Sequence, residues 1–67
     1  MPNETKFEQA FRHVVEGRRV VARQQALIER ERAAGRDTSR AEQLLEQFER
    51  TLAIFEQDLR ELQKQLN

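Results

Sequence analysis

The side chains in this sequence best suited to chemistry are those of His13 and Glu16, which lie three residues apart and would share one side of a helix. An imidazole and a carboxylate at this spacing can bind a metal ion, and dimerisation would duplicate the pair. Di-metal helical bundles, however, combine Glu-x-x-His motifs with further inward-pointing glutamates. We expect Glu16 to point away from the helix seam, so the sequence predicts neither a metal site nor a cofactor. His13 is expected to be partly exposed, with Asp58 as a candidate partner.

Arg18 and Gln25 are polar residues at positions where a helical seam would normally carry apolar side chains. One interpretation is a ligand or anion site between two helices. The interpretation that the sequence favours is that Arg18 lies over Phe55 while its charged end reaches solvent or Asp58. Gln25 would then bond to its symmetry mate, because polar residues at seam positions fix the register and oligomeric state of helical assemblies.

Several other classes of function find no support in the composition. Cysteine is absent, and the few hydroxyl groups lie at predicted helix caps or without a base nearby, so a nucleophilic enzyme is not indicated. The net charge is zero and glutamates interrupt the arginines, which argues against nucleic-acid binding. No apolar run approaches the ~18 residues of a membrane span, and no signal segment opens the sequence. We therefore expect a cytoplasmic, non-enzymatic protein that binds neither nucleic acid nor membrane.

The elements that must position these side chains are two helices. Charged residues make up 36% of the 67 residues, with only two glycines and one proline, a composition typical of helices. We expect one all-α domain over residues 1–67, folded as an antiparallel, coiled-coil-like helical hairpin. Its predicted parts are a helix over about 4–34, a turn over 35–38 and a helix over about 39–66.

Local signals mark the predicted helix ends. Gly35 can adopt the left-handed conformation that closes a helix C-terminus. Ser39 with Glu42, and Thr5 with Glu8, have the spacing of a capping box at a helix N-terminus. The rival N-terminal caps are Asn3, Asp37 and Thr38.

The predicted core of the hairpin follows from apolar residues that recur at steps of three and four. It comprises Phe7, Phe11, Val14, Val21, Ile28, Leu45, Phe48, Leu52, Phe55, Leu59, Leu62 and Leu66. One antiparallel register places Val14 opposite Leu59. The same register places Phe11 opposite Leu62 and Arg18 opposite Phe55.

A second apolar row is predicted beside this seam, and a two-helix hairpin cannot cover it because each helix has only one neighbour. The predicted partner interface comprises Ala10, His13, Gly17, Val20, Gln24, Leu27, Leu44, Thr51 and Ile54. Since a core of this size rarely supplies more than about 3–5 kcal/mol, we expect a homodimer that forms a four-helix bundle. The alternative is an adaptor or regulator whose face docks a helix of a different protein, such as a signalling or transcription component. A monomer with scattered exposed apolar residues is a third interpretation.

Residues 17–52, which read GRRVVARQQALIERERAAGRDTSRAEQLLEQFERTL, carry a resemblance to known proteins. This stretch resembles a group of short bacterial helical-hairpin proteins of unknown function, in which an Arg/Gln-rich first helix leads into a Gly-x-Asp-Thr turn. The turn corresponds here to residues 35–38, and the resemblance covers about half the chain. It implies a helical hairpin and carries no activity.

Overall fold

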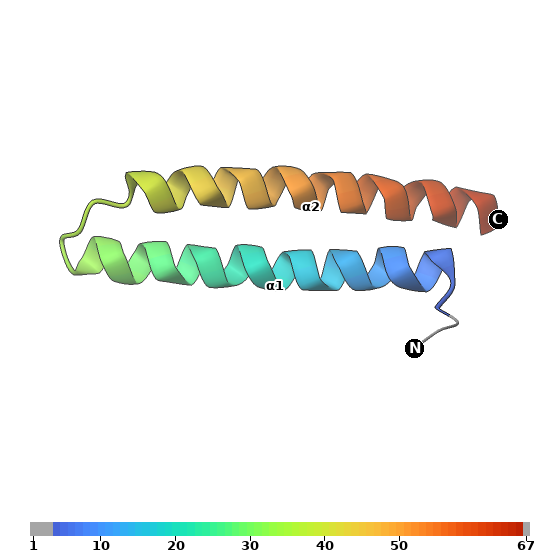
Figure 1. The fold of residues 1–67 in the computed structure, drawn as a ribbon, viewed down its shortest axis with the longest axis horizontal. Helices are drawn as coiled ribbons and strands as arrows, with labels where there is room; N and C mark the ends of the chain where they lie inside the picture. Colours follow the sequence, from blue (N-terminus) through green and yellow to red (C-terminus); the bar gives the residue numbers. More distant parts are fainter. Residues whose placement is uncertain (1–3, 67) are drawn as a thin grey trace.

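The computed structural model describes residues 4–66 and consists of two antiparallel helices joined by a short turn (Figure 1). Helix α1 spans Lys6–Ala33 and helix α2 spans Ser39–Leu66, with 28 residues each. At ~1.5 Å per residue each helix is about 42 Å long, so the equal lengths let them pack side by side along their whole extent. The predicted all-α helical hairpin is therefore confirmed.

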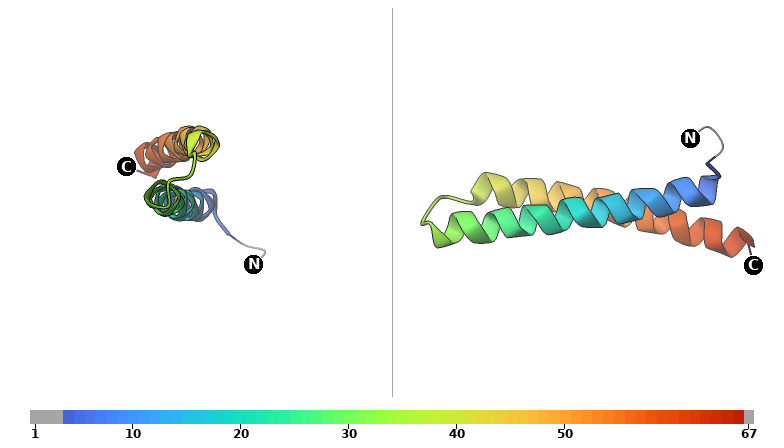
Figure 2. Two further views of the ribbon diagram at one scale, coloured as in Figure 1. Left: turned by 90° about the vertical axis from the view of Figure 1, so that its left-hand side faces the viewer. Right: turned by 90° about the horizontal axis from the view of Figure 1, so that it is seen from below.

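The hairpin is elongated. Its principal extents are 49 × 23 × 14 Å and its radius of gyration is 15.3 Å, whereas a compact domain of this length has about 11 Å. Figure 2 shows the reason: seen from the end, the molecule is one pair of helices with no third element beside it. Both long faces of the pair are therefore open over the described residues.

Helix α1 begins with the predicted capping box. The backbone N–H of Glu8 donates to Thr5 Oγ1 at 3.0 Å, and the backbone N–H of Thr5 donates to Glu8 Oε1 at 2.9 Å. The two bonds satisfy donors that the first helical turn would otherwise leave free. The rival cap, Asn3, lies outside the described residues.

Helix α1 ends at the predicted glycine. Gly35 has a φ of +76°, its N–H donates to the carbonyl of Arg32 at 3.0 Å, and the N–H of Arg36 donates to the carbonyl of Glu31 at 2.9 Å. These two bonds form a Schellman motif, which needs a residue in the left-handed region just after the helix. Glycine adopts that conformation without the steric penalty of a Cβ atom.

Helix α2 begins differently from the expected Ser39–Glu42 capping box. The backbone N–H and the hydroxyl of Ser39 both donate to Asp37 Oδ1, at 2.9 and 2.7 Å. The Glu42 carboxylate instead accepts from the hydroxyl of the buried Thr38 and from Arg32 at 3.2 Å. The bond from the Ser39 backbone lowers the pKa of Asp37, and the Thr38 hydroxyl, with Arg32 as a smaller cause, lowers the pKa of Glu42.

The seam between the helices uses the predicted row of α2 but a different row of α1. In α2 the half-buried positions of the seam are 41, 45, 48, 52, 55, 59 and 62, and in α1 the buried or half-buried positions at the same alternating spacing are 10, 14, 17, 21, 24, 28 and 31. The expected seam positions Phe11, Arg18, Gln25 and Arg32 are all exposed. In every second layer of the predicted packing, the α1 residue that faces α2 is therefore the one directly before the predicted residue.

Side-chain size explains this correction. In two of the four affected layers the adopted row of α1 places a small residue near a large side chain of α2, Ala10 near Leu62 and Gly17 near Phe55. The helices can then approach closely, while the polar row reaches water. As a consequence the predicted core residue Phe11 is 54% exposed.

Leu66 was also predicted to lie in the core, and it is 70% exposed because it is the last residue of α2, where α1 offers little to cover it. Within residues 4–66 the buried hydrophobic side chains are those of Ala10, Val14 and Ile28. The hairpin alone therefore has a thin core, with most of its apolar residues only half-buried.

Candidate functional site

The two edges of the seam differ in character, and this difference defines the candidate site. Along one edge Arg18 lies 3.3 Å from Glu56. Arg32 lies 3.2 Å from Glu42 along the same edge. These ion pairs join α1 to α2 at the surface, where each contributes at most about 1 kcal/mol, and they make this edge polar.

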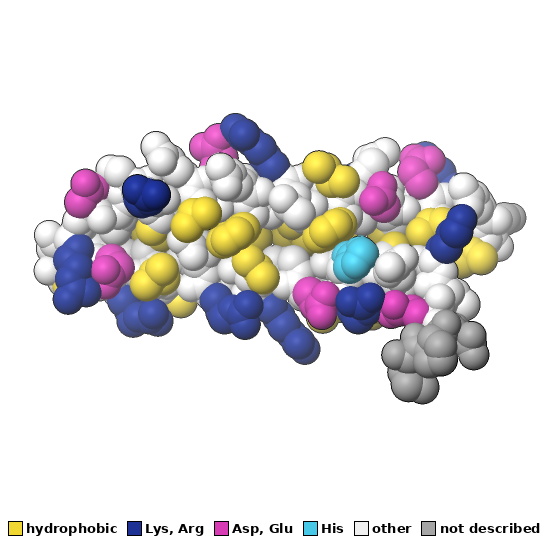
Figure 3. Space-filling view, in the orientation of Figure 1, with side chains coloured by type: hydrophobic (Ala, Val, Ile, Leu, Met, Phe, Trp, Pro, Cys, Tyr) yellow, Lys and Arg dark blue, Asp and Glu magenta, His cyan; other side chains and the backbone are white. Residues whose placement is uncertain are grey.

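The opposite edge is apolar. We use the name second face for its six residues, His13, Val20, Leu27, Leu44, Thr51 and Ile54. Val20 and Leu27 are half-buried, whereas Leu44 is 42% and Ile54 is 61% exposed. Figure 3 shows this face as a line of apolar side chains along the boundary between the helices, with the histidine beside it.

A shallow groove of about 370 Å³ runs along the middle of the second face. It is lined by His13 and Val20 from α1 and by Thr51 from α2, with Phe48 and Phe55 of the seam at its floor. The structure therefore brings residues of both helices together on one side of the hairpin, as the sequence predicted for His13, Val20 and Thr51.

Three further residues that we predicted for the partner interface belong to the seam of the hairpin itself. Ala10 is only 8% exposed. A Cβ atom at Gly17 would lie 3.1 Å from Leu52 Cδ1. Gln24 Nε2 donates to the carbonyl of Ala41 in α2 at 2.9 Å. The small size of Ala10 and Gly17, opposite large residues of α2, is the sequence signal that could have placed them there.

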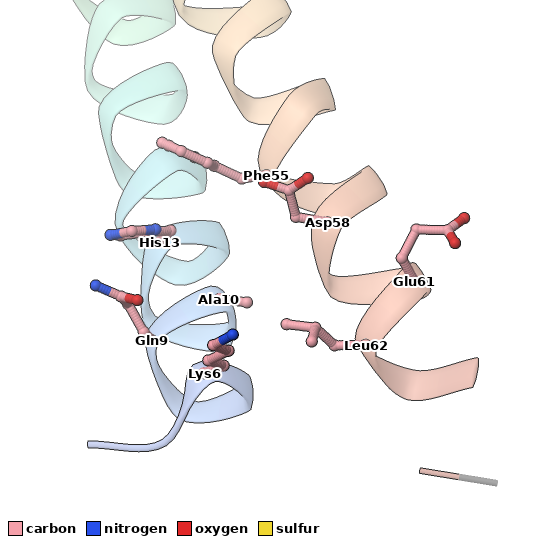
Figure 4. A pocket seen from close by; sticks show the side chains of 8 residues that line it. All are labelled: Lys6, Gln9, Ala10, His13, Phe55, Asp58, Glu61 and Leu62. Atoms are coloured by element: carbon pink, nitrogen blue, oxygen red, sulfur yellow. The ribbon is translucent and has the colours of Figure 1, made fainter. Parts of the chain in front are cut away.

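His13 occupies the place predicted for Arg18. Its ring lies 4.8 Å from that of Phe55, at an interplanar angle of 31°. Arg18 extends away from this ring, with its side chain 67% exposed. Asp58 and His13 line one groove of about 440 Å³ near the chain ends (Figure 4). No hydrogen bond joins these two side chains in the described structure.

Glu16 also faces the second face, since it lines the same groove as His13. Its carboxylate is 3.3 Å from Arg12 Nη1. Arg12 in turn donates two hydrogen bonds of 2.9 Å to Glu4, which lowers the pKa of that carboxyl. Among residues 4–66 no three His, Asp or Glu side chains gather closely enough to bind a metal ion.

Neither α1 nor α2 is both long and apolar enough to cross a membrane, judged over the described residues. The second face is an apolar strip along the middle part of the hairpin, bordered by charged residues. The resemblance to bacterial helical-hairpin proteins stays a prediction. Comparison of the chain with protein-family models, with curated proteins and with solved structures finds no match.

Proposed function

We propose that this chain is a small, cytoplasmic, non-enzymatic interaction protein that homodimerises through its second face, so that two hairpins form a four-helix bundle. The observation that carries the proposal is the exposure of Leu44 and Ile54 beside the half-buried Val20 and Leu27. They lie on the edge of the seam opposite the Arg18–Glu56 and Arg32–Glu42 pairs that join the helices in the described part of the chain. A row of this kind, rimmed by charged residues, is typical of a surface that another helix covers.

The accessible area of the chain supports the same proposal. The hairpin exposes 5534 Å², whereas a compact monomer of 8.0 kDa exposes about 4450 Å². The excess of about 1100 Å² is comparable to the ~800 Å² that each partner buries in a stable interface. A second copy packed on the second face would remove an excess of this size.

The thin core points in the same direction. Small domains commonly need a disulfide, a metal or oligomerisation to become stable, and this chain has no cysteine. Covering Val20, Leu27 and Ile54 would add apolar burial at about 25 cal/mol per Å². Dimerisation would thus supply stability that the seam alone does not.

The experiment is sedimentation equilibrium at micromolar concentration, where we expect a mass of about twice 8.0 kDa. Ile54→Asp should shift the protein to the monomer, whereas Ala53→Asp, at an exposed neighbouring position, should leave the dimer intact. Leu27→Asp and its exposed neighbour Ala26→Asp repeat the comparison on α1. Because Ile54 is 61% exposed in the hairpin, its replacement tests association with little effect on the monomer fold.

A folded monomer that keeps its helicity would refute homodimerisation. It would favour the alternative function, in which the same second face docks a helix of a different protein. Equal association of Ile54→Asp and Ala53→Asp would show that the chain dimerises through another surface.

A further inference from the structure

Two rows of exposed residues border the second face, and their charges are unevenly distributed along its length. We call them the rim rows. Gln9, Glu16 and Glu61 line the grooves of this face, and steps of seven residues stay on one side of a helix. The rim row of α1 is Gln9, Glu16, Arg23 and Arg30, and that of α2 is Arg40, Gln47 and Glu61, at steps of seven or fourteen residues along the helix.

The half of the face near the chain ends is acidic. Glu16 and Glu61 occupy the rim there, and Asp58 lines the groove between them, with Lys6 and the Arg12 that pairs with Glu16 as opposing charges. In Figure 3 acidic side chains gather on the part of α2 near the chain ends.

The half of the face near the turn is basic. Its rim carries Arg23, Arg30 and Arg40, all exposed. Within residues 4–66 none of these three arginines is paired with a carboxylate. Figure 3 shows several basic side chains along α1 in this half, with fewer acidic ones among them, and Glu31 there is paired with Arg36. The second face is therefore electrically polarised along the hairpin.

This polarity bears on how a second copy can pack. A two-fold axis allows two face-to-face arrangements of the proposed dimer. With the turns at opposite ends, α1 faces α1 of the second copy in antiparallel fashion, and α2 faces α2. With the turns at the same end, α1 faces α2 of the second copy.

Resting on the proposed homodimer, we infer that the second copy packs with its turn beside the chain ends of the first. Glu16 and Arg23 lie at equal distances from the midpoint of α1, so an antiparallel α1 pair sets Glu16 against Arg23 of the second copy. The α2 pair sets Arg40 within about one helical turn of Glu61 of the second copy. Symmetry repeats each contact, which gives four pairs of opposite charge.

The other arrangement brings like charges together. With both turns at one end, Arg30 of α1 lies within about one turn of Arg40 of the second copy. Glu16 lies within about one turn of Asp58 of the second copy, and symmetry again doubles each contact. Opposite charges at an interface rim select the correct orientation and like charges disfavour the wrong one, so the dimer with its turns at opposite ends is preferred.

The decisive experiment measures the distance between two spin labels in the dimer. The chain has no cysteine, so Ala33→Cys places one label per copy on an exposed residue at the turn end of α1. With turns at opposite ends the labels are separated by roughly 40 Å along the bundle. With turns at the same end only the cross-section of the bundle separates them, roughly 25 Å or less.

A long label distance together with a dimeric mass supports the inference. A short distance in a dimer overturns the orientation and leaves the proposed homodimer standing. A monomeric mass overturns the homodimer and this inference with it, so the two failures are distinguishable.

Charge reversal gives a second test that needs no label. Arg23→Glu should weaken the dimer roughly tenfold at low salt, because two symmetric attractions become repulsions. Adding Glu16→Lys to that variant should restore most of the affinity. Arg19→Glu, an exposed residue seven positions before the exposed Ala26 and away from the second face, is the matched control. Equal affinities of Arg23→Glu and Arg19→Glu would overturn the inference.

Discussion

Replacing each of the two glycines by alanine is expected to change the stability of the hairpin in opposite directions. Gly17 lies in the middle of α1 and faces α2, whereas Gly35 lies in the turn with a positive φ. The substitution is chemically identical at both sites. Any difference between the two variants therefore reports the backbone conformation and the space around each glycine.

At Gly17 a gain in helix propensity competes with a tight contact. Alanine is more favourable than glycine inside a helix by about 1 kcal/mol. The new Cβ would lie 3.1 Å from Leu52 Cδ1 and 3.6 Å from Phe55 Cδ2. Only the first is closer than the ~3.5 Å of an ordinary carbon contact, so the end of the half-buried Leu52 side chain must move by about 0.4 Å. We expect the propensity gain to prevail, with a net stabilisation of about 0.5 kcal/mol.

At Gly35 the balance is reversed. No atom lies within 4 Å of a Cβ placed there, so steric space is not the difficulty. The φ of +76° costs a residue with a Cβ atom roughly 1–2 kcal/mol. Alanine also lowers the conformational entropy of the unfolded chain, which offsets part of this destabilisation. We expect Gly35→Ala to destabilise the hairpin by about 1 kcal/mol.

The assay is urea denaturation followed by circular dichroism, at one fixed protein concentration because association would contribute to apparent stability. In thermal melts the same changes correspond to a rise of about 2–4 °C for Gly17→Ala and a fall of about 4–8 °C for Gly35→Ala. A loss of stability for Gly17→Ala would refute the reasoning, since it would mean that the Leu52 side chain cannot move to admit the new Cβ atom. Unchanged stability of Gly35→Ala would contradict the role assigned to its left-handed conformation.

Two further predictions concern polar contacts. Gln24→Glu should destabilise the hairpin by about 1 kcal/mol, because a carboxylate would repel the Ala41 carbonyl that now accepts a hydrogen bond from the amide. Gln25→Glu, at the exposed neighbouring position, should be close to neutral in the same urea titration. Equal losses of stability in the two variants would contradict the prediction. The pKa of Asp37 is lowered in the folded chain by the Ser39 N–H, so its stabilising contribution is present above the unfolded pKa of about 3.9 and is lost as the pH falls through the lower folded value. Stability measured from pH 6 to pH 2.5 should therefore fall less steeply in Asp37→Asn than in the parent chain, and parallel curves would count against this assignment.

Much of the hairpin could be predicted because the signals involved are local. The box of Thr5 and Glu8 and the left-handed Gly35 depend on bonds within a few residues, and both are observed. At Ser39 the local signal predicted only part of the structure. Ser39 begins α2 as expected, but its backbone N–H and its hydroxyl donate to Asp37 and do not form the expected capping box with Glu42. Neighbouring capping residues compete for the same donors, and spacing alone does not decide between them.

The sequence by itself determined two amphipathic helices of equal length, the turn between them and an apolar row beside the seam. Only the tertiary structure decided which row of α1 faces α2. Phe11 and Ala10 are adjacent, and the hydrophobic pattern favours the larger one for the core, yet Ala10 is buried and Phe11 is 54% exposed. The reason is that the packing of two helices depends on the size and shape of the facing side chains as well as on their polarity. Against the large side chains of α2, Ala10 and Gly17 allow a close approach, and this choice leaves Val20, Leu27 and Ile54 on the open second face.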